Sequence, residues 1–483
     1  MFAESMKKVE KLNKSELTEL PELPDCVISH IFSMLSLKTL LKTSALSKQW
    51  FHEWGLRKMK DLNFDLHNMF DYNTMPELPK NLPLFQEVQS QFATRLNDFM
   101  LKYHSDVIRS IRVNFPLGRD HTNVIDRLIY KGILNGVNRI ELLFACETDD
   151  DTEIEIDILK PYIFLFLFLS DSDSLTYLHL QNCHISVPMK FSRLKNLRTL
   201  VLHLIPLKQN MLQDLLLNCM HLENLTLDEC TLNSDLKIIS PTLLHLSIID
   251  CCHKNCYSYK IMINIDALNL SSFEYRGYKS KISIEAPKLL NVFWDAGVRK
   301  YSVYNFSRIA RLHHVENLAM TIHHSQIAKL MKHLVQFQNL RQLELFIAGT
   351  DDPNINYFWI LDIVMASQHL QNLSLRIKNE HADKSHMIGF DRQRREYVGF
   401  YHNNLKYVKL YGCVCSSNII ELASQLLRSV NSLKQITFSS RHDSYIGAER
   451  WTEGFDRCCW FDQNLIHELF KDEVNEQCQL IIL

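Results

Sequence analysis

Glycine and proline are scarce in this sequence. There are 12 of each among 483 residues, together about 5% of the chain where about 12% is average usage. Few turns are therefore expected to need a positive φ, which glycine adopts most readily. We expect long regular elements to dominate the fold.

The chain also lacks an excess of positive charge. Lysine and arginine total 53, aspartate and glutamate total 55, and the formal net charge is −2. Nucleic-acid binders neutralise phosphates with a basic excess or a basic face, so the electrostatic case for a nucleic-acid partner is removed. Hydrophobic residues make up 46% of the chain, which is enough to bury a core and excludes general disorder.

No apolar run is long enough to cross a membrane. The most apolar stretch is Tyr162–Leu169, with the sequence YIFLFLFL, whereas a bilayer requires about twenty residues. It is more consistent with a buried segment on the convex side of a repeat fold. Residues 1–19 mix lysine with glutamate and lack the apolar centre of a signal peptide. We expect a flexible tail over 1–19, no membrane contact, and a soluble protein of the cytoplasm and/or nucleus.

Chemistry-bearing motifs are equally sparse. The 13 cysteines form an odd set without a disulfide-scaffold spacing, which favours reduced thiols in an intracellular protein. The best metal candidate is Cys251–Cys256, but structural zinc sites usually join two separated ligand pairs. Phosphate-binding loops, nucleophile elbows and zinc-protease motifs are missing. We therefore expect no metal, no cofactor and no catalytic activity in this chain.

The first predicted unit is a group of three short helices over 20–66. Pro24 and Asp25 can start the first helix, Ser36 can cap the second, and Ser44 or Ser47 can begin the third. Such a small unit has a thin core and usually needs a partner or a following domain. An ordinary helical subdomain packed on the rest of the chain is the alternative.

A repeated pattern fills most of the remaining chain. The frame apolar-x-x-apolar-x-apolar occurs 13 times between Ile108 and Phe438, at a mean spacing of about 27 residues, which is typical of leucine-rich repeats. Four copies carry a cysteine three residues after the frame, where that repeat has asparagine or cysteine. These are Cys183, Cys230, Cys251 and Cys413. The alternative is an α/β domain with leucine-rich strands and no solenoid.

Each repeat is predicted to be a strand followed by a helix. Met211–Leu217 and Ile419–Leu427 have helical spacing before the next frame. Stacked repeats would form an α/β solenoid, a curved parallel sheet with helices on its convex side. We predict a connector over 67–105, the solenoid over 106–440 with a loop at Asn379–Phe400, and a C-terminal cap over 441–483. The aromatic residues that suggest this cap are Trp451, Phe455, Trp460 and Phe461.

The N-terminal residues resemble an F-box. The landmarks, in order, are Leu23-Pro24, Ile28, Ile31-Phe32-Ser33, Leu35, Leu41, Leu46-Ser47-Lys48 and Trp50. The repeats, and the region from Asn404 onward, are similar to plant F-box/leucine-rich-repeat proteins with an FBD-like C-terminal region. This resemblance implies a substrate-recognition subunit of an SCF-type E3 ubiquitin ligase. The rival interpretation is a leucine-rich-repeat scaffold or ligand-sensing interaction module without ubiquitin transfer.

The resemblance also implies two binding surfaces. An F-box docks on a Skp-type adaptor, which hangs from a cullin scaffold. The residues that would supply or support this docking surface are Leu23, Pro24, Ile28, Ile31, Leu35, Leu41 and Trp50. The solenoid would hold a target protein, whose identity the sequence does not give.

The target surface can be placed by strand geometry. Side chains alternate across a strand, so the positions between the buried frame residues should face the concave side. Aromatic residues and arginines are frequent interface anchors. Our strongest candidates for target binding are Arg276, Phe293, Phe346 and Arg376. The alternative is that the loop at 379–400 binds the target.

Overall fold

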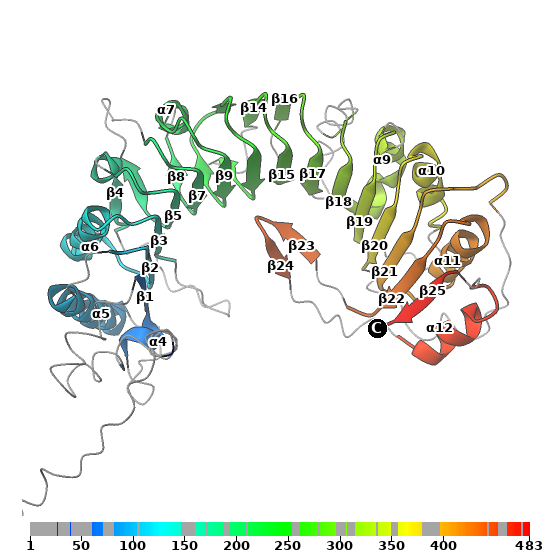
Figure 1. Cartoon of the computed structure of the whole chain (residues 1–483), viewed down its shortest axis with the longest axis horizontal. Coiled ribbons are helices and arrows are strands. Elements are labelled where there is room, and N and C mark those ends of the chain that lie inside the picture. Colours follow the sequence, from blue (N-terminus) through cyan, green and yellow to red (C-terminus); the bar gives the residue numbers. More distant parts are fainter. Residues whose placement is uncertain are drawn as a thin grey trace, which may run out of the picture.

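The structure is an arch lined by one curved sheet (Figure 1). It is a computed structural model that describes residues 27, 39, 60–70, 82–103, 107–145, 160–170, 172–186, 194–208, 211–253, 261–277, 281–295, 306, 314–334, 337–348, 356–378, 397–441, 444–452, 461–474 and 477–483. Among these residues, no helix combines the length and apolarity needed to cross a membrane.

Fifteen parallel strands form the sheet. In spatial order they are β1 (Asp61–Asp65), β2 (Ser110–Asn114), β3 (Arg139–Leu143), β5 (Tyr177–Gln181), β7 (Thr199–His203), β9 (Asn224–Asp228), β12 (His245–Ile249), β15 (Ser272–Arg276), β17 (Asn291–Asp295), β18 (Asn317–His323), β19 (Gln342–Ala348), β20 (Asn372–Ile377), β21 (Tyr407–Gly412), β22 (Gln435–Ser439) and β25 (Gln479–Ile482). Each of the 13 predicted frames contributes one strand, from β2 to β22. The predicted α/β solenoid is confirmed.

The frame residues build a continuous core behind the sheet. Neighbouring strands pair without a shift, so Leu178 lies beside Leu200 and Leu180 beside Leu202. All four side chains are fully buried. Aromatic packing thickens the core at mid-arch, where the Trp294 ring lies 4.8 Å from that of Tyr275. Each repeat therefore depends on its neighbours for burial.

Helices cover the convex side towards both ends of the arch (Figure 1). They are α5 (Leu82–Lys102), α6 (Thr122–Leu134), α7 (Met211–Asn218), α9 (Ile327–Leu334), α10 (Trp359–Ala366), α11 (Ser417–Ser429) and α12 (Gln463–Phe470), with one short helix, α4 (Leu66–Met69), after β1. Single turns of 3-10 helix occur at Arg119–His121, Phe166–Leu169 and His324–Gln326. The predicted helical segments at Met211–Leu217 and Ile419–Leu427 are thus confirmed.

The middle repeats differ from the strand-plus-helix prediction. Their convex side is a second small parallel sheet of β11 (Leu236–Ile239), β14 (Met262–Asp266) and β16 (Lys281–Glu285). The frames that begin at 222, 243, 270 and 289 are 21, 27 and 19 residues apart, so two of these three intervals are shorter than the 25 residues that hold α7 between the frames at 197 and 222. Their convex segments also alternate apolar and polar residues, the period of a strand.

Short paired strands lie beside the N-terminal half of the main sheet. They are β4 (Ile163–Leu165) with β6 (His184–Ser186), and β10 (Thr231–Leu232) between β8 (Pro206–Leu207) and β13 (Cys252–His253). Tyr162, Phe164 and Phe166 are fully buried there. One side of the apolar run at 162–169 is therefore part of the core, as predicted, while Leu165 and Leu167 are exposed.

The sheet begins earlier than the sequence analysis placed it. Strand β1 lies within the range assigned to the F-box, and α5 lies within the predicted connector. Leu62 and Phe64 are buried, and the Phe64 ring contacts Phe99 of α5 at 5.2 Å. The segment from 61 onward therefore belongs to the solenoid. The signal was present, because Met59-x-x-Leu62-x-Phe64 fits the repeated frame.

The C-terminal segment also differs from a simple cap. Helix α12 and strand β25 do close the last repeat, and the Phe470 ring stacks on Phe438 at 5.2 Å. Residues 444–452 do not. They form a hairpin of β23 (Ser444–Gly447) and β24 (Arg450–Thr452) that lies inside the arch, against the middle of the sheet (Figure 1). Trp451, which the sequence predicted to belong to the cap, lies on this hairpin.

Cysteines at the end of successive strands support the repeat stacking. The Cys230 thiol donates to the Leu202 carbonyl at 3.2 Å, and Cys251 donates to Leu227 at 3.4 Å. Burial raises the pKa of the Cys183 thiol, so it stays protonated. Cys413 is disulfide-bonded, which differs from the expectation that all thiols are reduced.

Candidate functional site

One lateral row of side chains runs along the concave face. Strand register places one residue from each strand side by side. From β5 to β22 this central row is His179, Val201, Thr226, Ser247, Glu274, Phe293, Ala319, Glu344, Ser374, Lys409 and Thr437. These are the positions that strand alternation predicted. Because these side chains lie on the face of the sheet opposite the buried frame residues, they form the inner surface of the arch.

The four predicted target-binding residues form two separate pairs. Arg276 and Phe293 come from the adjacent strands β15 and β17, and Phe346 and Arg376 come from β19 and β20. The strand β18 separates the pairs. Phe346 and Arg376 are direct neighbours in register. The structure thus brings the candidates together two by two.

The hairpin covers the first of these pairs. The Tyr445 ring meets Phe293 edge to face at 4.8 Å between centroids, and the Tyr445 hydroxyl donates to the Glu274 carboxylate. The backbone N–H of Ala448 donates to the other Glu274 oxygen at 2.8 Å, and Ser247 donates to it at 2.7 Å. Glu274 is therefore the main polar anchor of the hairpin.

A second carboxylate holds the other strand of the hairpin. Arg450 Nη2 donates to Asp228 Oδ1 at 2.8 Å. The Asp228 side chain is only 6% exposed, and this burial raises its pKa while Arg450 opposes the rise. Arg276 Nη1 lies 3.5 Å from the Ile446 carbonyl, and its Nε lies 3.1 Å from Asp250. Opposite charges therefore match across this contact.

Glycine is required at the tip of the hairpin. Gly447 has a φ of +91°, and a Cβ there would lie 2.4 Å from the Cδ1 atom of Ile249. The next two residues, Ala448 and Glu449, also have positive φ values. A tight left-handed turn is thus seated directly on the floor of the arch. A side chain at 447 would be strained at this φ and would press on Ile249.

The hairpin divides the concave face into two hollows. On the β3–β15 side, a cavity of about 730 Å³ is lined by His179, His203, Asp228 and the turn residues 448–450. A smaller hollow of about 230 Å³ lies over β15–β19, with Phe293 and Glu344 in its wall. Burial lowers the pKa of His179 to about 4, so its imidazole is neutral at physiological pH.

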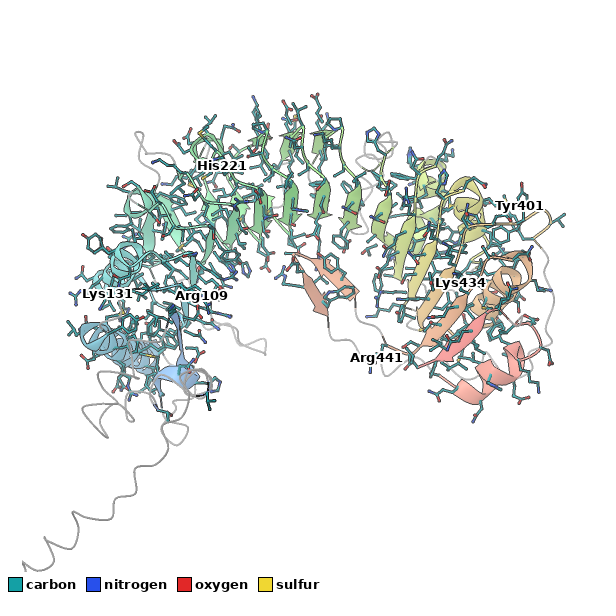
Figure 2. The ribbon with its side chains drawn as sticks, in the orientation of Figure 1. Arg109, Lys131, His221, Tyr401, Lys434 and Arg441 are labelled. Carbon is teal, nitrogen blue, oxygen red and sulfur yellow. The ribbon has the colours of Figure 1, made fainter. Side chains whose placement is uncertain are left out.

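Arg376 occupies the second candidate position beside the hairpin. Its Nε donates to Glu344 at 2.7 Å, and its guanidinium lies 4.5 Å from the Tyr411 ring centre and 5.3 Å from that of Trp451. Trp451 is 52% exposed. Arg441 lies at the inner edge of the arch, between β22 and the hairpin (Figure 2). A cluster of aromatic and basic side chains therefore borders the hairpin on its C-terminal side.

Metal ligation finds little support within the part of the chain that is described. His203, Asp228 and Glu229 offer ligand atoms within 4.8 Å of one another. Arg450 already pairs with Asp228, and His203 shares a hydrogen bond with Gln181 at 3.0 Å. An ion-pair network accounts for these groups. Of the predicted cysteine candidate, Cys252 is exposed and Cys256 lies outside the described residues.

The structure does not describe the predicted adaptor-binding residues. All of them lie outside the described residues: Leu23, Pro24, Ile28, Ile31, Leu35, Leu41 and Trp50. Most of the loop at 379–400 lies there as well. Tyr397, near its end, donates to Asp362 of α10.

Sequence reasoning missed the hairpin as part of the concave face. Its local signal is a Gly447-Ala448 turn between two short segments with aromatic residues. That signal indicates a hairpin but not where it docks. The docking hydrogen bonds join residues 170 to 222 positions apart, a separation that no short-range pattern encodes.

Comparison with known proteins assigns the two parts of the chain. Residues 100–474 match the leucine-rich-repeat domain of the At1g61320/AtMIF1 family, and residues 20–54 match the F-box domain. The chain therefore belongs to this family of plant F-box/leucine-rich-repeat proteins. It is similar to At1g61330 of Arabidopsis thaliana, a candidate FBD-associated F-box protein, with 26% identity over 349 residues. The match covers 67% of this chain and 68% of that protein.

Proposed function

We propose that this protein is the substrate-recognition subunit of an SCF-type E3 ubiquitin ligase. The observation that carries the proposal is an F-box match at 20–54 joined to a solenoid whose concave face carries the predicted target-binding residues. F-box domains generally bind Skp-type adaptors, and such an adaptor would link the chain to a cullin scaffold. The solenoid would then hold a target protein, in the cytoplasm or nucleus.

The proposed mechanism is proximity. The F-box/leucine-rich-repeat family is typically non-catalytic, so bond formation would belong to the partners. Holding a target lysine near a ubiquitin-charged enzyme raises its effective concentration. The role of this chain would be to position the target through the concave face, where Arg276, Phe293, Phe346 and Arg376 lie.

A ligand-sensing module without ubiquitin transfer is the second candidate. The cavity of about 730 Å³ beside the hairpin favours it, because small-molecule sites commonly occupy 300–1,000 Å³. Adaptor binding separates the two functions, since a module of this second kind needs no Skp-type partner.

Removing Leu23-Pro24, the first of the F-box landmarks in the sequence, should abolish adaptor binding. We expect the double variant Leu23→Ala and Pro24→Ala to lose co-purification with a Skp-type adaptor, because these residues would contact it or support the contact. The matched control changes Leu20 and Pro21, an identical pair three residues upstream, to alanine and should retain the adaptor. Unchanged adaptor binding by a folded Leu23/Pro24 variant would contradict the assignment.

A further inference from the structure

The hairpin covers part of the surface that the sequence predicts to bind the target. It covers Arg276 and Phe293, and it donates hydrogen bonds to the carboxylates of Glu274 and Asp228. We infer that the hairpin 444–452 is a built-in occupant of this surface, and that a target displaces it with a loop of like chemistry. This inference rests on the proposed function, because it assumes that the concave surface binds a target and names the class of that target.

The contacts of the hairpin are suited to release. None of its residues belongs to the hydrophobic core of the described chain, and an isolated two-stranded hairpin is at best marginally stable in water. Among the described residues it is attached by hydrogen bonds, the Arg450–Asp228 ion pair, the Tyr445–Phe293 ring contact and the cation–π contact of Arg376 with Trp451. Releasing it would therefore leave the solenoid intact.

Release would also leave charged groups without their donors. Asp228 is buried, and Glu274 would lose the Tyr445 hydroxyl and the Ala448 N–H. An incoming segment that covers these acceptors again without supplying donors would leave them unpaired, which is costly. The surface therefore favours any incoming segment that restores the same donors over one that does not. This selects the chemistry of the target.

The hairpin supplies the template for that chemistry. A phenol reaches Glu274 and packs its ring on Phe293, and a guanidinium five residues later reaches Asp228. Between them, Gly447 makes the left-handed turn that fits against Ile249. The target class is therefore a protein loop with the pattern Tyr-x-Gly-x-x-Arg.

A peptide copy of the hairpin tests this inference on the full-length chain. The probe is fluorescent and carries residues 444–452 closed into a ring through two added terminal cysteines. A tethered segment competes at an effective concentration on the order of 1 mM, so micromolar probe should bind the wild type weakly. We expect at least tenfold tighter binding to Arg450→Glu, whose own hairpin loses its ion pair while the groove is unchanged.

Hydrogen exchange over 444–452 reports whether the hairpin has been released. If Arg450→Glu does not release it, Gly447→Leu provides a second route, because its side chain collides with Ile249. In a released variant, Asp228→Asn should weaken the probe, as should tyrosine to phenylalanine within the probe. Equal binding to wild type and released variant would overturn the inference, as would no binding to a released variant. Adaptor binding plays no part in this assay, so failure here is distinct from failure of the proposed function.

Discussion

Replacing Trp294 by alanine is expected to lower the free energy of unfolding by about 3–5 kcal/mol. The side chain is 1% exposed. Its ring lies 4.8 Å from Tyr275 and 6.1 Å from Phe306 between centroids. The large cavity left behind would weaken the contact between neighbouring repeats at mid-arch, on which a solenoid depends. Chemical denaturation followed by circular dichroism measures the change.

Trp451→Ala is the matched control for that measurement. Trp451 is 52% exposed and lies on the hairpin, so its loss should cost less than about 1 kcal/mol. Similar small effects at both tryptophans would contradict the packing described for the middle of the arch.

Acid should destabilise the solenoid through His179. Burial lowers the pKa of this imidazole to about 4 in the folded chain, against about 6.5 when unfolded. Below pH 6.5 the unfolded chain therefore takes up a proton that the folded chain does not. Stability present above pH 6.5 is lost as the pH falls to about 4, by about 3 kcal/mol in total.

Urea unfolding of wild type and His179→Gln between pH 7 and pH 4 measures this loss. The variant should lack the histidine contribution to the pH dependence, because glutamine does not titrate. His245→Gln is the matched control, since His245 lines the same cavity from β12 but is exposed. If the free energies of wild type and His179→Gln fell in parallel, another group would carry the effect.

The repeated frame predicted the main sheet because it reflects burial. Positions such as Leu178 and Leu180 must face the core in every repeat, so the pattern is visible in one sequence. The same logic placed the central row, including Glu274 and Phe293, on the opposite face. Strand β1 obeys the frame too, but its frame begins at Met59, 49 residues before the next one at Ile108 and well outside the mean spacing of about 27 residues.

The remaining differences arise where no repeating pattern applies. On the convex side, strands formed where the segment alternates apolar and polar residues, and the shortest interval, 270 to 289, also leaves the least room for a helix. At the hairpin, Trp451 suggested a cap over the last repeat, whereas the segment that carries it contacts strands in the middle of the sheet. Its position depends on single distant partners, Asp228 and Glu274.

The central claim is that one chain joins an adaptor-binding F-box to a target-binding arch. Calorimetric titration of a purified Skp-type adaptor into the full-length chain tests it most directly. The account predicts one-to-one binding by the wild type, with the same affinity in Arg450→Glu, because the hairpin lies against the middle of the sheet and is separate in sequence from the F-box match at 20–54. Absence of adaptor binding by the folded wild-type chain would contradict it.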